Sequence, residues 1–187
     1  MDHYWDIHIR PDPELSQTHL MAALYARLHR ALVQAKASDL GVSFPAFQPE
    51  RPTLGGQIRL HGTHPGLVKL QQTRWLHGMY DHVTQDDLQA VPAAAAYRVV
   101  SRVQTRSSAE RLRRRHMRRH GLDESQVRAL IPDNIERRLA GPYVQMRSQS
   151  TGQPFRLFIQ HGPLLDTATP GAFNAYGLST SATIPWF

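Results

Sequence analysis

Residues 3–35 read HYWDIHIRPDPELSQTHLMAALYARLHRALVQA and decide how the fold begins. Polar and apolar side chains alternate from His3 to Arg10, which is typical of a β-strand with one buried face. Two prolines then end the strand, and an amphipathic helix is predicted from about Leu15 to Ala35 because apolar residues recur every fourth position. One apolar line of this helix holds Leu20, Leu24, Leu28 and Leu32, and the line beside it holds Met21, Tyr25, His29 and Val33.

The next segments continue this succession of strands and helices. Gly41–Phe47 and Gln57–His61 are predicted strands, and His64–Leu76 is a predicted helix. The order strand, helix, strand, strand, helix is typical of the ferredoxin-like βαββαβ motif. We therefore expect an α+β fold with a ferredoxin-like domain over residues 1–93.

A second, smaller α/β domain is expected over residues 94–187. Residues 91–96, VPAAAA, have the composition of a linker, and alternation resumes from Tyr97 to Arg106. An arginine-rich helix is predicted over residues 108–120. The other expected strands of this domain are Tyr143–Gln149 and Phe155–Gln160.

The composition limits the class of protein. Hydrophobic residues make up 41% of the 187 residues, which is enough for a packed core. The chain has no cysteine, and this excludes disulfides and thiolate metal sites. It has neither a run of about 18 apolar residues nor a signal-peptide pattern at its start, so we expect a cytoplasmic protein that does not span a membrane.

The positive charge is concentrated in one segment. The formal net charge is +7, and all basic residues except Lys36 and Lys69 are arginine. Residues 106–120 hold seven arginines and one glutamate. Arginine presents a planar fork of donors that fits phosphates and guanine edges. A basic segment of this kind indicates a nucleic-acid-binding surface.

This basic segment has the signals of a helix. Residues 107–110, SSAE, form a capping-box pattern, Gly121 suits the helix end, and Asp123 is predicted to cap a short helix to Leu130. The alternatives are a solvated basic face or a disordered arm. Nucleic-acid binding is favoured because five like charges within an arc of roughly 140° repel one another without an anionic partner. These five are Arg111, Arg114, Arg115, Arg118 and Arg119.

Arg102 and Gln104 lie on one face of the strand that precedes the helix. Arginine can read guanine and glutamine can read adenine through paired hydrogen bonds in a major groove. An exposed polar strand face is the alternative. A-form RNA has a deep and narrow major groove, so such reading would require a helix end or a short hairpin stem.

His29 is a candidate base on the edge of the apolar stripe of the first helix. A buried or boundary histidine is the commoner explanation of such a position. His61 with His64, and His116 with His120, have spacings seen in metal sites. Neither pair has a cysteine or a pair of carboxylates nearby, and arginines surround the second, so we expect no metal and no cofactor.

Hydroxyl and aromatic side chains near the C-terminus are further candidates. Ser148, Ser150 and Thr151 crowd a glycine-containing turn, which could hold a phosphate or a ribose hydroxyl, or could be an ordinary turn. Phe155 and Tyr176 could each belong to the core or stack on a base. The residues alone leave these alternatives open.

Six segments, in order along the whole chain, resemble one known family. They are MDHYWDIHIRPDPE at 1–14, GVSFP at 41–45, YRVVSRVQTRSSAERLRRRHMRRH at 97–120, RSQSTGQPFRLFI at 147–159, YGLS at 176–179 and PWF at 185–187. Together they are more specific than any single motif. On these segments the chain closely resembles the CRISPR subtype I-F repeat endoribonucleases, which process precursor CRISPR RNA.

The resemblance implies a substrate and the residues that bind it. The substrate would be the stem-loop of the repeat RNA, and the partners would be precursor and mature crRNA and the proteins of the subtype I-F surveillance complex. Arg102 and Gln104 would read base pairs at the foot of the stem, and Phe155 would stack under the terminal pair. The residues that would lie in the major groove are Arg114, Arg115, Arg118, Arg119 and His120.

The resemblance also implies the catalytic residues. His29 and Ser148 would act with Tyr176 close to the histidine, and Ser150 and Thr151 would lie near the scissile phosphate. The 2′-OH of the RNA would attack that phosphate at the 3′ base of the stem and leave a 2′,3′-cyclic phosphate, without a metal. The alternative is a non-catalytic RNA-hairpin-binding subunit of a ribonucleoprotein, which would explain the basic helix but not this catalytic pair.

Overall fold

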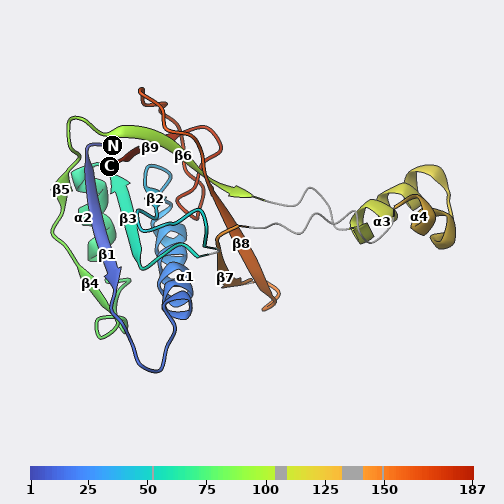
Figure 1. The fold of residues 1–187 in the computed structure, drawn as a ribbon, viewed down its shortest axis with the longest axis horizontal. Helices are drawn as coiled ribbons and strands as arrows, with labels where there is room; N and C mark the ends of the chain where they lie inside the picture. The colour runs from blue at the N-terminus through green and yellow to red at the C-terminus, as the bar shows by residue number, and fades with distance from the viewer. Residues whose placement is uncertain (52, 104–108, 132–140, 149) are drawn as a thin grey trace. The chain divides into compact units, whose positions relative to one another are not determined.

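The structure is a computed structural model that describes residues 1–51, 53–103, 109–131, 141–148 and 150–187 (Figure 1). It is a mixed α/β protein whose sheets are antiparallel. The chain forms two compact units, one made of residues 1–102 and 141–187 and the other of residues 103–140. No helix of the described residues is long and apolar enough to cross a membrane.

The first sheet is built around the N-terminal strand, as its alternation predicts. Trp5 and Ile7 of this strand are buried in one core with the leucine line of the first helix. The strands run in the order β2-β3-β1-β4, and a short fifth strand, β5, pairs with the start of β1. The bounds are β1 His3–Ile9, α1 Gln17–Ala35, β2 Gly41–Ser43, β3 Gln57–Gly62, α2 His64–Gln72, β4 Val83–Gln85 and β5 Gln89–Ala90.

The order of strands and helices in this half is the predicted one, but three boundaries differ by two residues or more. Helix α1 begins after Ser16, because the hydroxyl of this N-cap accepts the main-chain N–H of His19. Strand β2 stops at Ser43, and the following residues turn instead of extending to Phe47. Helix α2 ends at Gln72 rather than Leu76, and Arg74 nearby adopts a left-handed conformation with φ of 52°.

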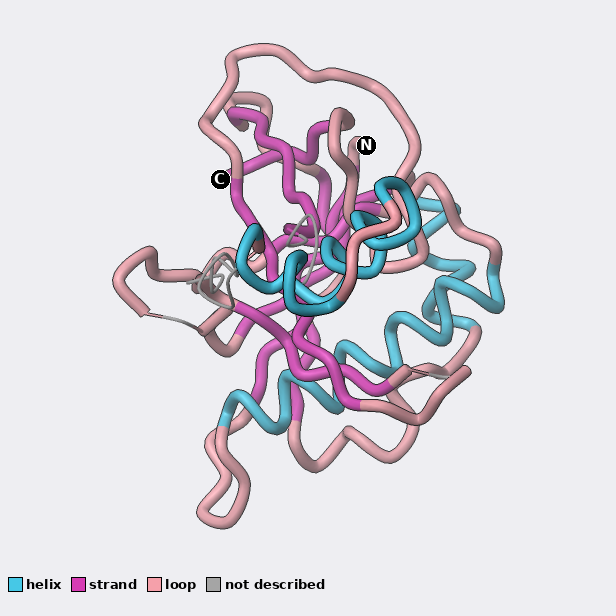
Figure 2. The backbone as a smooth tube through the Cα atoms, turned by 90° about the vertical axis from the view of Figure 1, so that its right-hand side faces the viewer, coloured by secondary structure: helices cyan, strands magenta, loops and turns pink. Residues whose placement is uncertain are grey.

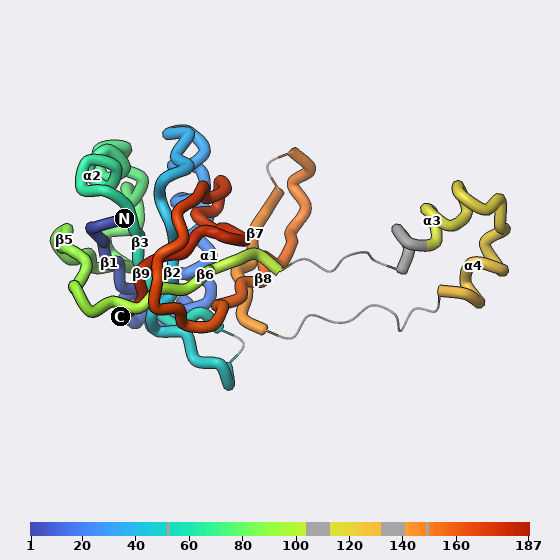
Figure 3. Tube along the Cα trace, turned by 90° about the horizontal axis from the view of Figure 1, so that it is seen from above, coloured from blue at the N-terminus to red at the C-terminus, as the bar shows by residue number. Residues whose placement is uncertain are grey.

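The second sheet shares a core with the first. Its strands lie in the order β7-β8-β6-β9, and β6 and β9 run side by side (Figure 3). Val100 and Ile184 from this sheet belong to the same hydrophobic cluster as Val42 from β2. The strands of both sheets are magenta in Figure 2. The bounds are β6 Ala96–Val103, β7 Tyr143–Arg147, β8 Pro154–His161 and β9 Thr183–Trp186.

The shared core differs from the predicted organisation of the chain. A boundary between residues 93 and 94 was expected to separate two domains, yet residues on both sides of it pack into one hydrophobic cluster. The compact units divide instead at residues 102 and 141. The alternation of the strands predicts which faces are buried, but it does not say against which partner they pack.

The second unit contains two helices, α3 at Ala109–His120 and α4 at Glu124–Leu130. Gly121 has a φ of 62° and follows α3, as predicted, and Asp123 forms a capping box with Gln126 at the start of α4. Leu122 packs against the buried Val127. Ser107 and Ser108, which were predicted to begin α3, lie outside the described residues.

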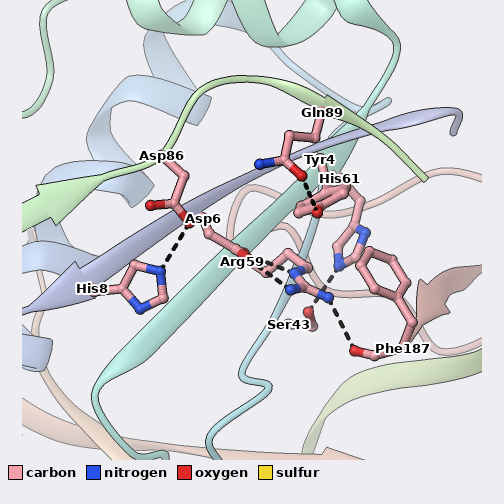
Figure 4. Close-up of polar contacts among 9 residues, drawn as sticks. All are labelled: Tyr4, Asp6, His8, Ser43, Arg59, His61, Asp86, Gln89 and Phe187. Atoms are coloured by element: carbon pink, nitrogen blue, oxygen red, sulfur yellow. Dashed lines mark hydrogen bonds and ion pairs between the residues drawn. The ribbon is translucent and has the colours of Figure 1, made fainter. Parts of the chain in front are cut away.

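Buried polar contacts join β1, β2, β3 and the C-terminal residue (Figure 4). Nε and Nη2 of Arg59 each donate to a carboxylate oxygen of Asp6 at 2.7 Å, and Nη1 donates to the main-chain oxygen of Phe187 at 3.1 Å. Nε2 of His61 lies 2.8 Å from the hydroxyl of Ser43. Burial lowers the pKa of His61 to about 3, so this histidine is neutral at physiological pH.

Candidate active site

His29 lies near the end of α1, and its ring is held by a main-chain carbonyl. Its Nδ1 is 2.7 Å from the oxygen of Ala175. A carbonyl oxygen can only accept a hydrogen bond, so Nδ1 carries the hydrogen. In the neutral ring the lone pair is then on Nε2, which is the atom that can take up a proton. In the half-buried His29, Nε2 is therefore the ring nitrogen that could accept a proton.

Tyr176 covers the His29 ring. The two ring centroids are 4.2 Å apart and the planes differ by 9°, so the rings are stacked. The guanidinium carbon of Arg102 lies 5.8 Å from the Tyr176 ring centroid and 5.7 Å from that of Phe155. The structure thus brings four of the predicted site residues together from α1, β6, β8 and the segment before β9, with a positive charge among them.

Two further residues, which no sequence motif marks as functional, hold this arrangement. Tyr25 was assigned to an apolar line, but its hydroxyl donates to the main-chain oxygen of Tyr176 at 2.7 Å. Asn174 accepts the main-chain N–H of Tyr176 on its side-chain oxygen at 2.8 Å. The sequence carried one signal for this turn, because asparagine followed closely by Gly177 is typical of turns closed by an Asn side chain.

The predicted hydroxyl cluster is a tight turn between β7 and β8. The hydroxyl of Ser148 lies 3.2 Å from that of Ser150 and accepts the main-chain N–H of Thr151 at 3.3 Å. Gly152 closes the turn with a φ of 68° and donates its N–H to the main-chain oxygen of Ser148 at 2.9 Å. Within the described residues, Ser148 and His29 make no hydrogen bond to each other.

Within its own compact unit, the arginine helix α3 has an exposed face. Arg113 lies outside the predicted arc, and its guanidinium donates to the main-chain oxygen of Ile131 at 2.6 and 2.9 Å. Gln104 and the side chain of Arg111 lie outside the described residues. The exposed members of the predicted RNA-binding set are Arg114, Arg115, Arg118, Arg119 and His120.

One group of possible metal ligands occurs among the described residues. Atoms of Asp6, His8 and Asp86 lie within 4.8 Å of one another. The carboxylate of Asp6 is already paired with Arg59 through both oxygens, and that neighbouring positive charge opposes a cation. None of these residues belongs to the predicted catalytic set, and the metal-free chemistry stays a prediction.

Comparison with known proteins identifies the family. The family model described as CRISPR-associated protein (Cas_Csy4) matches residues 4–187. The chain belongs to this family. A relative from Pseudomonas aeruginosa (strain UCBPP-PA14) is named CRISPR-associated endonuclease Cas6/Csy4 and is 50% identical over 187 residues, which is the whole of both chains.

The chain is also similar to a second relative and to a solved structure. The Cas6/Csy4 endonuclease from Escherichia coli (strain UTI89 / UPEC) is 43% identical, again over the whole of both chains. A Cas6 product complex covers 95% of this chain and 88% of its own, with 13% identity and a TM-score of 0.27. The resemblance to subtype I-F repeat endoribonucleases that the six segments predict is confirmed by the family match and the full-length relatives.

Proposed function

We propose that this protein is a metal-independent endoribonuclease that binds the CRISPR repeat hairpin and cleaves it at the 3′ base of its stem to produce mature crRNA. The family and the names of its relatives support an endonuclease of a CRISPR system. The observation that carries the catalytic part is His29, whose Nδ1 is bound to the oxygen of Ala175 so that Nε2 is left as the base.

The nucleophile in this reaction belongs to the RNA itself. Nε2 of His29 takes the proton of the 2′-OH, and the 2′-oxygen forms a bond to the adjacent phosphorus. The bond from phosphorus to the 5′-oxygen breaks, and that oxygen gains a proton on leaving. The products are a 2′,3′-cyclic phosphate and a 5′-OH. A positioned base of this kind contributes about 10²–10⁴ in rate.

The turn between β7 and β8 supplies the positioning groups. Ser148 holds the ribose hydroxyl in line with the leaving oxygen, which is an orientation effect. Ser150 and Thr151 lie near the scissile phosphate. Two hydroxyls 3.2 Å apart and a main-chain N–H within the same turn support this role. Tyr176 keeps the His29 ring in one plane through the stacking contact.

The remaining predicted residues bind the hairpin. Arg102 and Gln104 read base pairs at the foot of the stem, and Phe155 stacks under the terminal pair. The contact between the Arg102 guanidinium and the Phe155 ring supports a joint position at the end of the stem. The partners are precursor crRNA, mature crRNA and the proteins of the subtype I-F surveillance complex. The major groove is contacted by Arg111, Arg114, Arg115, Arg118, Arg119 and His120.

Replacing two exposed arginines of α3 tests whether this helix binds the RNA hairpin. We expect Arg115→Ala with Arg119→Ala to weaken hairpin binding roughly 100-fold at physiological salt, because each charge-assisted hydrogen bond is worth about 1.5 kcal/mol or more. The slope of log Kd against log salt should also fall by about 2, since two phosphate contacts are lost. Filter binding at several salt concentrations measures both quantities.

The control variant removes the same charge elsewhere. Arg10 and Arg51 are exposed residues outside the candidate site, and replacing both by alanine also lowers the net charge by two. This control should leave the affinity nearly unchanged. Equal losses in the two double variants would mean that α3 contributes only its overall charge and would contradict insertion into a groove.

A cleavage assay on the repeat hairpin separates the two candidate functions. With EDTA present throughout, the proposed ribonuclease should cut once at the 3′ base of the stem and leave a 2′,3′-cyclic end, which mass spectrometry identifies. A non-catalytic binding subunit would shift the hairpin in a gel without cutting it. Cutting that stops in EDTA and resumes with a divalent cation would overturn the metal-independent mechanism.

A further inference from the structure

Two side chains one turn apart on α1 hold two consecutive main-chain carbonyls. His29 donates from Nδ1 to the oxygen of Ala175 at 2.7 Å, and Tyr25 donates from its hydroxyl to the oxygen of Tyr176, also at 2.7 Å. Residues four apart on a helix lie on the same face, so both reach the same short segment. The carbonyl of Tyr176, one residue after the carbonyl that orients His29, is therefore bonded to the same helix that carries His29.

We propose that Tyr25 and Asn174 are positioning residues that fix the tautomer and orientation of His29 by holding the Ala175 carbonyl in place. This inference rests on the proposed role of His29 as the base. Neither residue touches the reacting atoms in this account, since Tyr25 is fully buried and Asn174 acts through the main chain of its own turn.

Asn174 closes the turn that presents this carbonyl. Its side-chain oxygen accepts the main-chain N–H groups of Tyr176 at 2.8 Å and Leu178 at 3.3 Å. Its own main chain makes two more bonds across the turn, to the oxygen of Leu178 and from the N–H of Gly177, both at 2.8 Å. Four hydrogen bonds thus restrain a segment of five residues.

The turn is also anchored to the first sheet. The main-chain N–H of Val42 in β2 donates to the oxygen of Gly177 at 2.9 Å. Gly177 has a φ of 69°, and a Cβ built there would lie 2.3 Å from a methyl group of Val42, so only glycine fits. Tyr25 on α1 and Val42 on β2 therefore bind the carbonyls of Tyr176 and Gly177, the two residues that follow Ala175.

Tyr25 is suited to act as a permanent donor. Its ring is completely buried, and this burial raises the pKa of its hydroxyl above the ordinary value for tyrosine. The hydroxyl is therefore protonated at physiological pH and can donate to the Tyr176 carbonyl. Tyr25→Phe removes this donor, keeps the ring that packs beside Phe44, and leaves the Tyr176 carbonyl without this hydrogen bond.

The chemical consequence concerns which nitrogen of His29 carries the hydrogen. If the Ala175 carbonyl moves away, the ring is free to place its hydrogen on Nε2, and that atom can no longer accept the proton of the 2′-OH. Loss of a tautomer-fixing partner in serine proteases costs about 10⁴ in kcat. Removing a residue that only holds this partner in place is expected to lower the cleavage rate about 10- to 100-fold.

The experiment measures single-turnover cleavage of the repeat hairpin and hairpin affinity for each variant of the full chain. Tyr25→Phe and Asn174→Ala should each slow cleavage about 10- to 100-fold while affinity changes less than about threefold. Asn174→Asp keeps an acceptor oxygen at the same position and should restore most of the rate. In ¹⁵N NMR spectra, the His29 ring should be hydrogenated on Nδ1 in the wild type and show a mixture of tautomers in the two slow variants.

Each outcome decides the inference. If His29→Ala is inactive while Tyr25→Phe and Asn174→Ala cut at the wild-type rate, the positioning role is wrong and the proposed function stands. If His29→Ala itself cuts normally, the proposed function is wrong. A slow Tyr25→Phe variant that loses affinity in the same proportion, or keeps the wild-type His29 tautomer, would show a general structural role and would also overturn the inference.

Discussion

His29→Ala is expected to bind the repeat hairpin as tightly as the wild type and to cut it about 10²–10⁴ times more slowly. The half-buried His29 ring makes a hydrogen bond through Nδ1 and a stacking contact with Tyr176, and both contacts lie within the candidate site. Removing it deletes the proton acceptor for the 2′-OH but none of the groups proposed to grip the stem. Single-turnover cleavage and equilibrium binding on the same RNA measure the two effects separately.

A matched control for this variant is His19→Ala. His19 is an exposed histidine on the same helix, and its side chain has no place in the proposed site. It should cut at close to the wild-type rate. Normal cutting by His29→Ala would remove His29 from its role, and an equal loss in both variants would point to damage of α1 rather than loss of a base.

Asp6→Ala is expected to lower the free energy of unfolding by about 3–5 kcal/mol, because removing one partner of a buried ion pair leaves the other charge uncompensated. Asp6 is 4% exposed and Arg59 is 8% exposed. The guanidinium also lies 4.5 Å from the Tyr4 ring and 4.1 Å from the Phe187 ring, so its place in the sheet is fixed. Urea unfolding followed by tryptophan fluorescence measures the change.

Asp86→Ala is the control for this measurement. Asp86 is exposed and lies 3.2 Å from Nε2 of the partly exposed His8, so its loss should cost no more than about 1 kcal/mol. If Asp6→Ala lowered the free energy of unfolding no more than Asp86→Ala does, the contact between Asp6 and Arg59 would not contribute substantially to the stability of the fold. Because Asp6 is buried and Asp86 is exposed, a difference between the two variants would show that burial of the ion pair causes the larger loss of stability.

Elements that have a clear pattern within their own sequence, such as alternation, helical spacing or capping residues, could be predicted. The alternation of β1 and the fourfold spacing of the leucines gave the first strand and helix, and Gly121 and Asp123 marked the end of α3 and the start of α4. Strands β4 and β5 escaped prediction because they are short, lie beside β1, and show no alternation of their own. Their position depends on pairing with a distant strand, which no window of sequence contains.

The candidate site could be predicted only in part for the same reason. His29 stood out weakly in a boundary position, and the partner that orients it is a main-chain oxygen 146 residues away. Every residue has a main-chain oxygen, so the pattern of side chains does not show which one will bind His29. Tyr25 lies on the apolar face of its helix, so the sequence pattern explained it as a core residue and did not indicate its hydrogen bond to Tyr176. The assignment of Ser148 came from the family resemblance, since a serine in a turn is common.

Whether the RNA supplies its own nucleophile is tested with a repeat hairpin that carries a single 2′-deoxy sugar on the 5′ side of the scissile phosphate. We expect this RNA to bind like the unmodified hairpin and to remain uncut during an incubation that converts all of the unmodified RNA. Cutting of the deoxy substrate at the same bond would overturn the proposed mechanism, because it would require a nucleophile other than the 2′-OH and would leave His29 without the proton it is proposed to remove.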